Sequence, residues 1–311
     1  MEQNRNMAWN QLGFLPGARK EVTLFDAEGE SRIDLKEQGS DKIVASFDLE
    51  KPRMNADTGN VCSRGDFSAF KDQGTFYLQA GDHKSEPFTI GEDVYDQVLS
   101  ELIYMLHLQR CGCELTSEEA GEFAHASCHD TPARIYGTDE TMDATGGWHD
   151  AGDYGRYIVP AAKTVVDLLM AYAHYQEVME KNNPKKGPAL LDEVRYEIDW
   201  MLKMQRADGG VYHKVTCASF PDMDIMPEEE REELIVCPVS NASTACFAAS
   251  LSYATTIYKK TDAAYADRLL KAAESAYTYL SEHMDAPGFH NPEGIVTGEY
   301  GDENWIDDYF W

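Results

Sequence analysis

The sequence predicts a multidomain chain, with a β-sandwich over residues 1–90 and a helical domain over residues 91–311. Two observations lead to this division. Up to about residue 90, short runs of alternating apolar residues are separated by Gly, Asp and Pro, as in short antiparallel strands. Beyond Gly91, apolar residues recur every three or four positions, which is typical of amphipathic helices.

The strand candidates share alternating β-branched or aromatic residues, and they lie at 21–25, 42–47, 74–78 and 86–90. Helical periodicity predicts helices at 94–110, 159–180, 188–205, 242–260, 262–283 and from 304 onward. Ser240-Asn241 is expected to cap the fourth of these helices. Helix pairs at this spacing predict an all-α domain of the α/α toroid type.

Two long connections, 111–157 and 207–240, lack helical periodicity. Connections of this length in a compact domain are often functional. The first is rich in Cys, His, Asp and Gly, whereas the second contains the acidic run 228–233. We expect the acidic run to be a solvated surface, since charge runs usually are.

The charge balance excludes some partners. With 27 Lys and Arg against 55 Asp and Glu, the formal charge is −28, whereas binding to a phosphate backbone needs clustered positive charge. We therefore expect no nucleic-acid partner. No run of about 18 apolar residues is present, so no membrane-spanning helix is expected. The first residues show no signal peptide, which leaves a cytoplasmic protein or a removed leader.

The seven cysteines are an odd number, which argues against a fully paired disulfide framework. Three of them lie within 111–128, a clustering that favours metal binding over disulfides. Cys111, Cys128, His129 and His149 together offer two thiolates and two imidazoles, the donor set of a closed tetrahedral zinc site. Their spacing alone does not separate this interpretation from a buried cysteine with unrelated surface histidines.

The segment Gly146-Gly147-Trp148-His149-Asp150-Ala151-Gly152-Asp153-Tyr154-Gly155 is the strongest functional pattern. A tight turn there would point the carboxylates of Asp150 and Asp153 the same way, as i,i+3 neighbours. Trp148 and Tyr154 offer flat faces on which sugar rings can stack. An isolated Asp-x-x-Asp is nevertheless common in turns and helix caps, where it has no catalytic role.

The ten residues closely resemble the signature of glycoside hydrolase family 9, the endoglucanase and cellulase family. The resemblance implies hydrolysis of β-1,4-glucosidic bonds with inversion, Asp153 being the general base and Asp150 helping to hold the attacking water. It also implies that Trp148, Tyr154 and His213 contact the substrate, a β-glucan polysaccharide or oligosaccharide. His213 lies in Val211-Tyr212-His213-Lys214-Val215, which is similar to a cleft-lining segment of the family.

The resemblance extends over essentially the whole chain. Asn10-Gln11-Leu12-Gly13-Phe14-Leu15-Pro16 resembles the opening of the immunoglobulin-like module that precedes many bacterial family 9 domains. The implied architecture is an immunoglobulin-like sandwich followed by the N-terminal half of an (α/α)6 barrel. In the family, the general acid is a Glu far toward the C-terminus of the catalytic domain. No Glu here lies in such a motif, so we expect a truncated chain that lacks the acid.

Two metal sites are implied as well. Arg110-Cys111-Gly112, Cys128-His129-Asp130 and His149 resemble the structural zinc site of module-bearing members, with Cys113 an alternative ligand to Cys111. The end of the chain resembles a segment in which an Asp-Glu pair can bind calcium. Here the pair is Asp307-Asp308, one side chain being shorter, and such a pair also simply complements a helix dipole.

Two other functions remain open. The chain can be a non-catalytic carbohydrate-binding fragment, or it can belong to an exo-acting β-glucosidase or glucosaminidase of the same family. The resemblance also implies secretion or a periplasmic location, although a cytoplasmic one stays open. No membrane partner is expected.

Overall fold

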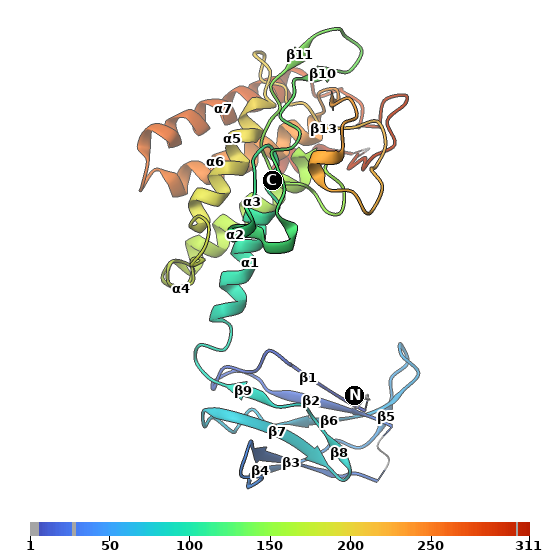
Figure 1. Cartoon of the computed structure of the whole chain (residues 1–311), viewed down its shortest axis with the longest axis vertical. Helices are drawn as coiled ribbons and strands as arrows, with labels where there is room; N and C mark the ends of the chain where they lie inside the picture. Colours follow the sequence, from blue (N-terminus) through green and yellow to red (C-terminus); the bar gives the residue numbers. More distant parts are fainter. Residues whose placement is uncertain (1–5, 27–28, 303) are drawn as a thin grey trace. The chain divides into compact units, whose positions relative to one another are not determined.

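The computed structural model describes residues 6–26, 29–302 and 304–311. The chain divides into two compact units, Met1–Leu99 (unit 1) and Ser100–Trp311 (unit 2), shown in Figure 1. The boundary expected at residue 90 lies between the last strand of unit 1, which ends at Ile90, and helix α1, which begins at Asp96. The first five residues, where no signal peptide is expected, lie outside the described part.

Unit 1 is an antiparallel β-structure of two sheets, as predicted (Figure 1). One sheet has the order β1-β2-β6-β5, formed by Met7–Trp9, Glu21–Phe25, Val61–Asp66 and Arg53–Met54. The other has the order β4-β3-β7-β8, formed by Ile43–Asp48, Arg32–Glu37, Gly74–Ala80 and His83–Lys84. Strand β9, Phe88–Ile90, also pairs with β7.

The core of unit 1 follows from alternation along the strands. In β2 the side chains of Val22 and Leu24 are buried, and in β3 those of Ile33 and Leu35 are buried. Alternate residues of a strand point to opposite faces, so each sheet places one apolar face against the other. The sequence analysis missed β3 and β6 because charged residues interrupt both runs, RIDLKE and VCSRGD.

The described helices lie in unit 2, apart from the first residues of α1, which belong to unit 1. They are α1 (Asp96–Leu108), α2 (Ser117–Ala120), α3 (Ile158–His174), α4 (Gln176–Lys181), α5 (Leu190–Lys203), α6 (Asn241–Tyr258), α7 (Ala263–Glu282) and α8 (Ile306–Phe310), with 3₁₀ turns at Gly121–Phe123 and Pro227–Glu229. Helix α6 packs against α3, α7 and α8, and α3 also packs against α5. No helix in the described residues is long and apolar enough to cross a membrane.

The expected cap of α6 is confirmed, because the Ser240 hydroxyl accepts a hydrogen bond from the Ser243 N–H at 3.0 Å. The single helix expected at 159–180 is instead two helices, α3 and α4. Tyr175 separates them with φ −133° and ψ 40°, outside the helical region. Helix-forming residues flank Tyr175 on both sides, so periodicity does not mark this break.

The prediction that residues 91–311 are all-α is wrong in one respect. The two long connections form a five-stranded sheet of order β11-β10-β14-β13-β12, made of Thr141–Met142, Ala133–Ile135, Ile235–Val236, Lys214–Thr216 and Arg156–Tyr157. Each strand has two or three residues, too few to show alternation in the sequence. The pairing Arg134↔Ile235 joins the two connections across about a hundred positions, so they form one structural element.

Candidate active site and metal centre

The ten-residue segment 146–155 lies just before β12 and folds back on itself. The Asp150 N–H donates to the Gly155 carbonyl at 3.1 Å, which closes a turn around Asp153. Both aspartates are half-buried. The turn therefore holds Asp150 and Asp153 close together within a short stretch of backbone.

Each of the two carboxylates is held by a tyrosine. The Tyr157 hydroxyl donates to Asp153 Oδ2 at 2.8 Å, and the Tyr300 hydroxyl donates to Asp150 Oδ2 at 2.6 Å. The two tyrosine rings contact each other edge to face, with 5.0 Å between centroids. Burial raises the pKa of both tyrosines, and the adjacent carboxylates raise it further, so both hydroxyls remain proton donors.

The environments of the two carboxylates differ. Burial raises the pKa of Asp150, the neighbouring Asp153 raises it further, and the bond from Tyr300 opposes this shift. Asp153 Oδ2 accepts a second hydrogen bond, from the Gly155 N–H at 3.2 Å. A Cβ atom at Gly155 would lie 2.5 Å from the Tyr157 hydroxyl and 2.8 Å from Asp153 Oδ2. Glycine is therefore required there for the Asp153–Tyr157 bond to form.

Trp148 is expected to offer an exposed face for sugar stacking, but its side chain is buried. Only 8% of the residue is exposed. Its backbone N–H donates to Glu197 Oε2 at 2.6 Å, and its indole N–H donates to Glu193 Oε1 at 2.7 Å. Both glutamates are buried, one turn apart on α5, and Arg110 pairs with Glu193 at 3.0 Å. Trp148 is thus an anchor that fixes the segment before His149 and Asp150.

His213 is also placed differently from the substrate contact expected for it. The residue is fully buried, and its ring stacks on Phe289 with 3.6 Å between centroids. Nε2 lies 2.8 Å from the Glu299 carbonyl, so it must donate, and Nδ1 accepts from the hydroxyls of Ser240 and Ser243. Burial lowers the pKa of His213 to about 4. The neutral ring therefore has no free nitrogen and supports the segment that carries Tyr300.

Tyr154 lies between the carboxylates and the cysteine–histidine group. Its ring is half-buried, 5.0 Å from the His149 ring and 5.7 Å from the His129 ring. Its hydroxyl donates to the Ile225 carbonyl at 2.5 Å. The residue expected to contact substrate therefore also links the motif to the second long connection.

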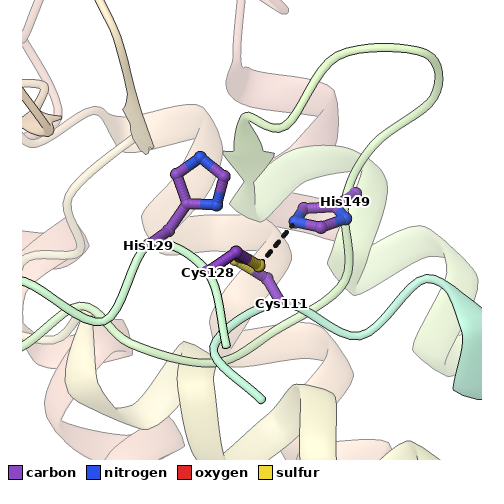
Figure 2. Close-up of side chains that lie close together, drawn as sticks. All are labelled: Cys111, Cys128, His129 and His149. Carbon is purple, nitrogen blue, oxygen red and sulfur yellow. Dashed lines mark hydrogen bonds between the residues drawn. The ribbon is translucent and has the colours of Figure 1, made fainter. Parts of the chain in front are cut away.

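Cys111, Cys128, His129 and His149 come together as a buried cluster, with one ligand atom from each residue within 4.8 Å of the others. Figure 2 shows the four side chains converging from three segments of the first connection. Cys128 Sγ lies 3.9 Å from Cys111 Sγ and 3.7 Å from His149 Nε2. The sequence left Cys113 as an alternative ligand, whereas the cluster contains Cys111. All seven cysteines are free.

The donor atoms of this cluster fit a zinc ion. Two thiolates and two imidazoles are the usual tetrahedral zinc shell. The hydrogen bond from the Cys111 thiol lowers the pKa of Cys128, whereas burial raises the pKa of Cys111 well above its usual value, so a thiolate is favoured at Cys128 and a thiol at Cys111. His129 Nδ1 is buried and has no hydrogen-bond partner among the described residues, as expected for a nitrogen that presents its lone pair to a metal.

The expectation that the acidic run 228–233 is a solvated surface needs correction. Glu233 is exposed and pairs with Arg134 at 2.7 Å, in line with that expectation. In contrast, the side chain of Glu230 is only 6% exposed and lies 2.9 Å from His129 Nε2. Burial alone would lower the pKa of His129, but its close contacts with the Cys128 sulfur and the Glu230 carboxylate raise it overall.

The expected calcium ligands, Asp307 and Asp308, lie in the first turn of α8. Asp308 is half-buried and accepts a hydrogen bond from the Cys246 thiol at 3.8 Å. Burial raises its pKa, and the charges of Asp307 and Asp302 raise it further. Across the described residues, the cysteine–histidine cluster is the one close group of three or more candidate ligands, and neither aspartate belongs to it.

Four residues that hold the site were not among the predicted site residues. Tyr157, Glu193 and Glu197 carry no motif of their own, and Tyr300 lies 150 positions from its partner Asp150. Two signals were available: the family-like segment 297–302, which contains Tyr300, and the helical spacing of the two α5 glutamates, which also suits a solvated helix face. Their partners become visible only in the folded chain.

Comparisons with known proteins identify the family of the chain. Residues 95–311 match the model of glycosyl hydrolase family 9, and residues 2–85 match that of the cellulase N-terminal ig-like domain. The chain is 39% identical over 312 residues to a cellodextrinase of Butyrivibrio fibrisolvens, covering 97% of this chain and 56% of that protein.

Two solved structures are similar as well. One is AaCel9A in complex with cellobiose-like isofagomine, with TM-score 0.91 and 36% identity, covering 99% of this chain and 58% of that one. The other is a Zn-binding triple mutant of the family 9 endoglucanase J30, with TM-score 0.89 and 31% identity, covering 96% and 58%. The chain spans little more than half the length of these proteins. The chain belongs to glycosyl hydrolase family 9.

Proposed function

We propose that the protein takes part in hydrolysing β-1,4-glucosidic bonds in cellulose or related β-glucans, with inversion of configuration. The observation that carries the proposal is the pair of half-buried carboxylates, Asp150 and Asp153, each held by a tyrosine hydroxyl. Membership of family 9 and the names of the similar proteins support the substrate class.

In this proposal Asp153 is the general base. Its Oδ2 accepts hydrogen bonds from Tyr157 and Gly155, which orient the carboxylate and leave Oδ1 to take a proton from water. Asp150, fixed by Tyr300, helps to hold that water. Inverting hydrolysis also needs a carboxylic acid that protonates the leaving oxygen. The proposal assigns this acid to no residue of the present chain.

The proposal gives the expected substrate contacts two different roles. Trp148 and His213 position the segments that carry Asp150 and Tyr300, because both are buried and fully bonded. Tyr154 is half-buried and remains a candidate substrate contact.

We further propose that the helices of unit 2 belong to an (α/α)6 barrel. We also propose that the protein acts outside the cytoplasm, which cell fractionation tests.

We propose that Cys111, Cys128, His129 and His149 hold one zinc ion. When bound, zinc supplies a fixed cross-link between the segments of the first connection, since four protein ligands leave no position for water. The Zn-binding mutant of the related endoglucanase is consistent with zinc in this family. Calcium at Asp307 and Asp308 is a weaker proposal, tested by the effect of a calcium chelator on thermal stability.

The test is Asp153→Asn in a preparation that releases reducing sugar from a soluble β-1,4-glucan. Loss of general-base catalysis should lower turnover about 100- to 10,000-fold while glucan binding is kept. Asp267→Asn, an exposed change on α7, is the matched control and should have no effect. NMR of the fresh hydrolysate should show the α-anomer first. Near-normal turnover of folded Asp153→Asn, or an initial β-anomer, would refute the base assignment.

The name of the cellodextrinase relative favours a second candidate, action on short oligosaccharides rather than on the polymer. Hydrolysis rates on a polymeric glucan, on cello-oligosaccharides and on aryl glycosides distinguish an endo-acting from an exo-acting enzyme. Binding of these sugars without any release of reducing ends would support a carbohydrate-binding role instead.

A further inference from the structure

We propose that Glu230 orients His129 as a metal ligand and thereby makes residues 217–234, here called the acidic segment, part of the metal centre. The inference rests on the zinc site of the proposed function. Glu230 and His129 are 101 positions apart and come from different long connections. Nothing in the ligand set itself requires the second connection to take part.

The geometry fixes which nitrogen of His129 is free. Nε2 lies 2.9 Å from Glu230 Oε2, and the two side chains are 1% and 6% exposed. Nδ1 is buried, and no residue that the structure describes forms a hydrogen bond with it. A neutral imidazole that binds a metal through one nitrogen carries its proton on the other. Nε2–H therefore donates to the Glu230 carboxylate, which selects the tautomer with a free lone pair on Nδ1.

The backbone at His129 makes this support necessary. Cys128 and His129 are adjacent, and adjacent side chains normally point apart, yet both contribute to one cluster. His129 adopts φ +49°, in the left-handed region that non-glycine residues rarely occupy. Such a conformation costs free energy and persists only where the surroundings hold it. Glu230 is a buried side chain that holds the imidazole through Nε2.

A second contact joins the acidic segment to the same histidines. The Tyr154 hydroxyl donates to the Ile225 carbonyl, and the Tyr154 ring packs against the rings of His129 and His149. Between its ends the segment exposes Met223, which is 93% exposed, and half of Phe220. Little apolar burial therefore holds this part of the segment. We infer that metal binding orders it, because the metal fixes the two rings that it contacts.

The experiment uses the chain with Zn²⁺ and Co²⁺ as probes. Zinc affinity is measured by competition with a chromophoric chelator for the unsubstituted protein, Glu230→Ala and Glu230→Gln. Outer-shell carboxylates typically contribute 10- to 100-fold to affinity, so Glu230→Ala should weaken zinc binding by about that factor. Glu230→Gln keeps an oxygen that can accept from Nε2–H and should restore most of it. Glu232→Ala, exposed in the same run, is the matched control.

Two further readouts do not depend on activity, and the second does not depend on the folding of a variant. The visible spectrum of the Co²⁺-loaded protein should change in Glu230→Ala and not in Glu232→Ala, because the orientation of His129 alters the ligand field. Hydrogen exchange of the unsubstituted protein should slow in residues 217–234 when zinc is added.

Wild-type zinc affinity in Glu230→Ala, or equal exchange of the acidic segment with and without zinc, would overturn the inference while leaving the zinc site intact. Failure of the unsubstituted chain to bind zinc would overturn the zinc site itself, and the role of Glu230 with it. The catalytic proposal for Asp153 is judged separately, since none of these measurements involves turnover.

Discussion

The sandwich of unit 1 and the two long connections of unit 2 are built by different forces. In unit 1, alternating residues such as Val22, Leu24, Ile33 and Leu35 form a contiguous apolar core between two sheets. In the connections, buried polar contacts fix the chain, including Trp148 with Glu197 and His129 with Glu230.

This difference has a physical consequence. Apolar burial is non-directional and roughly proportional to area, so many sequences can build a sandwich core. A buried polar contact contributes little net stability, but removing one partner leaves the other unsatisfied and costs much more. The connections therefore depend on a few specific residues, which suits a region that holds two carboxylates and the proposed metal ligands in fixed positions.

Removing a metal ligand should break the connections and spare the sandwich. Zinc binding contributes about 10 kcal/mol or more in small zinc-dependent domains. Even a loss of several kcal/mol lowers Tm by about 10 °C or more in a unit of this size. We expect Cys128→Ser to abolish stoichiometric zinc by elemental analysis and to lower only the calorimetric transition of unit 2. Cys62→Ser in unit 1 is the control, and equal stability of both variants would contradict the metal-dependent fold.

A cavity in the sandwich should have the opposite pattern. Leu78 is fully buried in β7, so Leu78→Ala should destabilise unit 1 by about 2–5 kcal/mol. Chemical denaturation measures this loss, and zinc stoichiometry should stay unchanged. Leu12→Ala removes an exposed leucine of the same unit and should have almost no effect. A change in zinc content on Leu78→Ala would show that the two regions are not energetically separate.

The buried carboxyl group of Glu197 on α5 should make the stability of unit 2 depend on pH. Burial raises the pKa of Glu197 from 4.5 to about 8, opposed by the Trp148 N–H and the charge of Arg156, while Glu193 raises it further. Between pH 4.5 and about pH 8, Glu197 keeps its proton in the folded protein, whereas the same side chain has lost it in the unfolded chain. This contribution to stability is therefore complete below about pH 4.5 and is lost as pH rises toward 8.

Glu197→Gln removes the titration but keeps an acceptor for the Trp148 N–H. We expect its stability relative to the unsubstituted protein to increase from pH 5 to pH 8, with a slope of at most about 1.4 kcal/mol per pH unit for one proton. Denaturant unfolding across this range measures the difference. Glu274→Gln, an exposed change on α7, should give a curve parallel to that of the unsubstituted protein. Parallel curves for both variants would mean that Glu197 does not titrate in this window.

The smallest effect is expected at the exposed end of the acidic run. Arg134 and Glu233 form an ion pair that is largely open to solvent, and such pairs contribute little because water screens them. We expect Glu233→Gln to leave Tm and zinc affinity unchanged, unlike Glu230→Ala a few residues earlier. A comparable loss in both variants would show that burial does not distinguish the two glutamates.

Local pattern was enough for much of the chain. The β2 strand, the cap of α6 and the positions of the long helices follow from period, turn residues and capping chemistry within a few positions. The aspartates of the 146–155 segment and the Cys–His ligand set were also visible, because residue type and a contiguous motif carry them. The α3–α4 break and the five-stranded sheet were not, since strands of two or three residues show no period.

The sequence by itself determined which side chains can do chemistry here: two carboxylates three residues apart, and two thiols with two imidazoles. Only the tertiary structure decided how they are held. Tyr157 and Tyr300 hold the carboxylates, Glu193 and Glu197 bury Trp148, and Glu230 faces His129. Most of these partners lie 45 to 150 positions apart, and a lone Tyr or Glu looks the same in the sequence whether it is solvated or buried. Long-range packing buries Glu230 and leaves Glu233 exposed to water. The loss of water from Glu230 makes its contact with His129 matter, whereas Glu233 stays solvated.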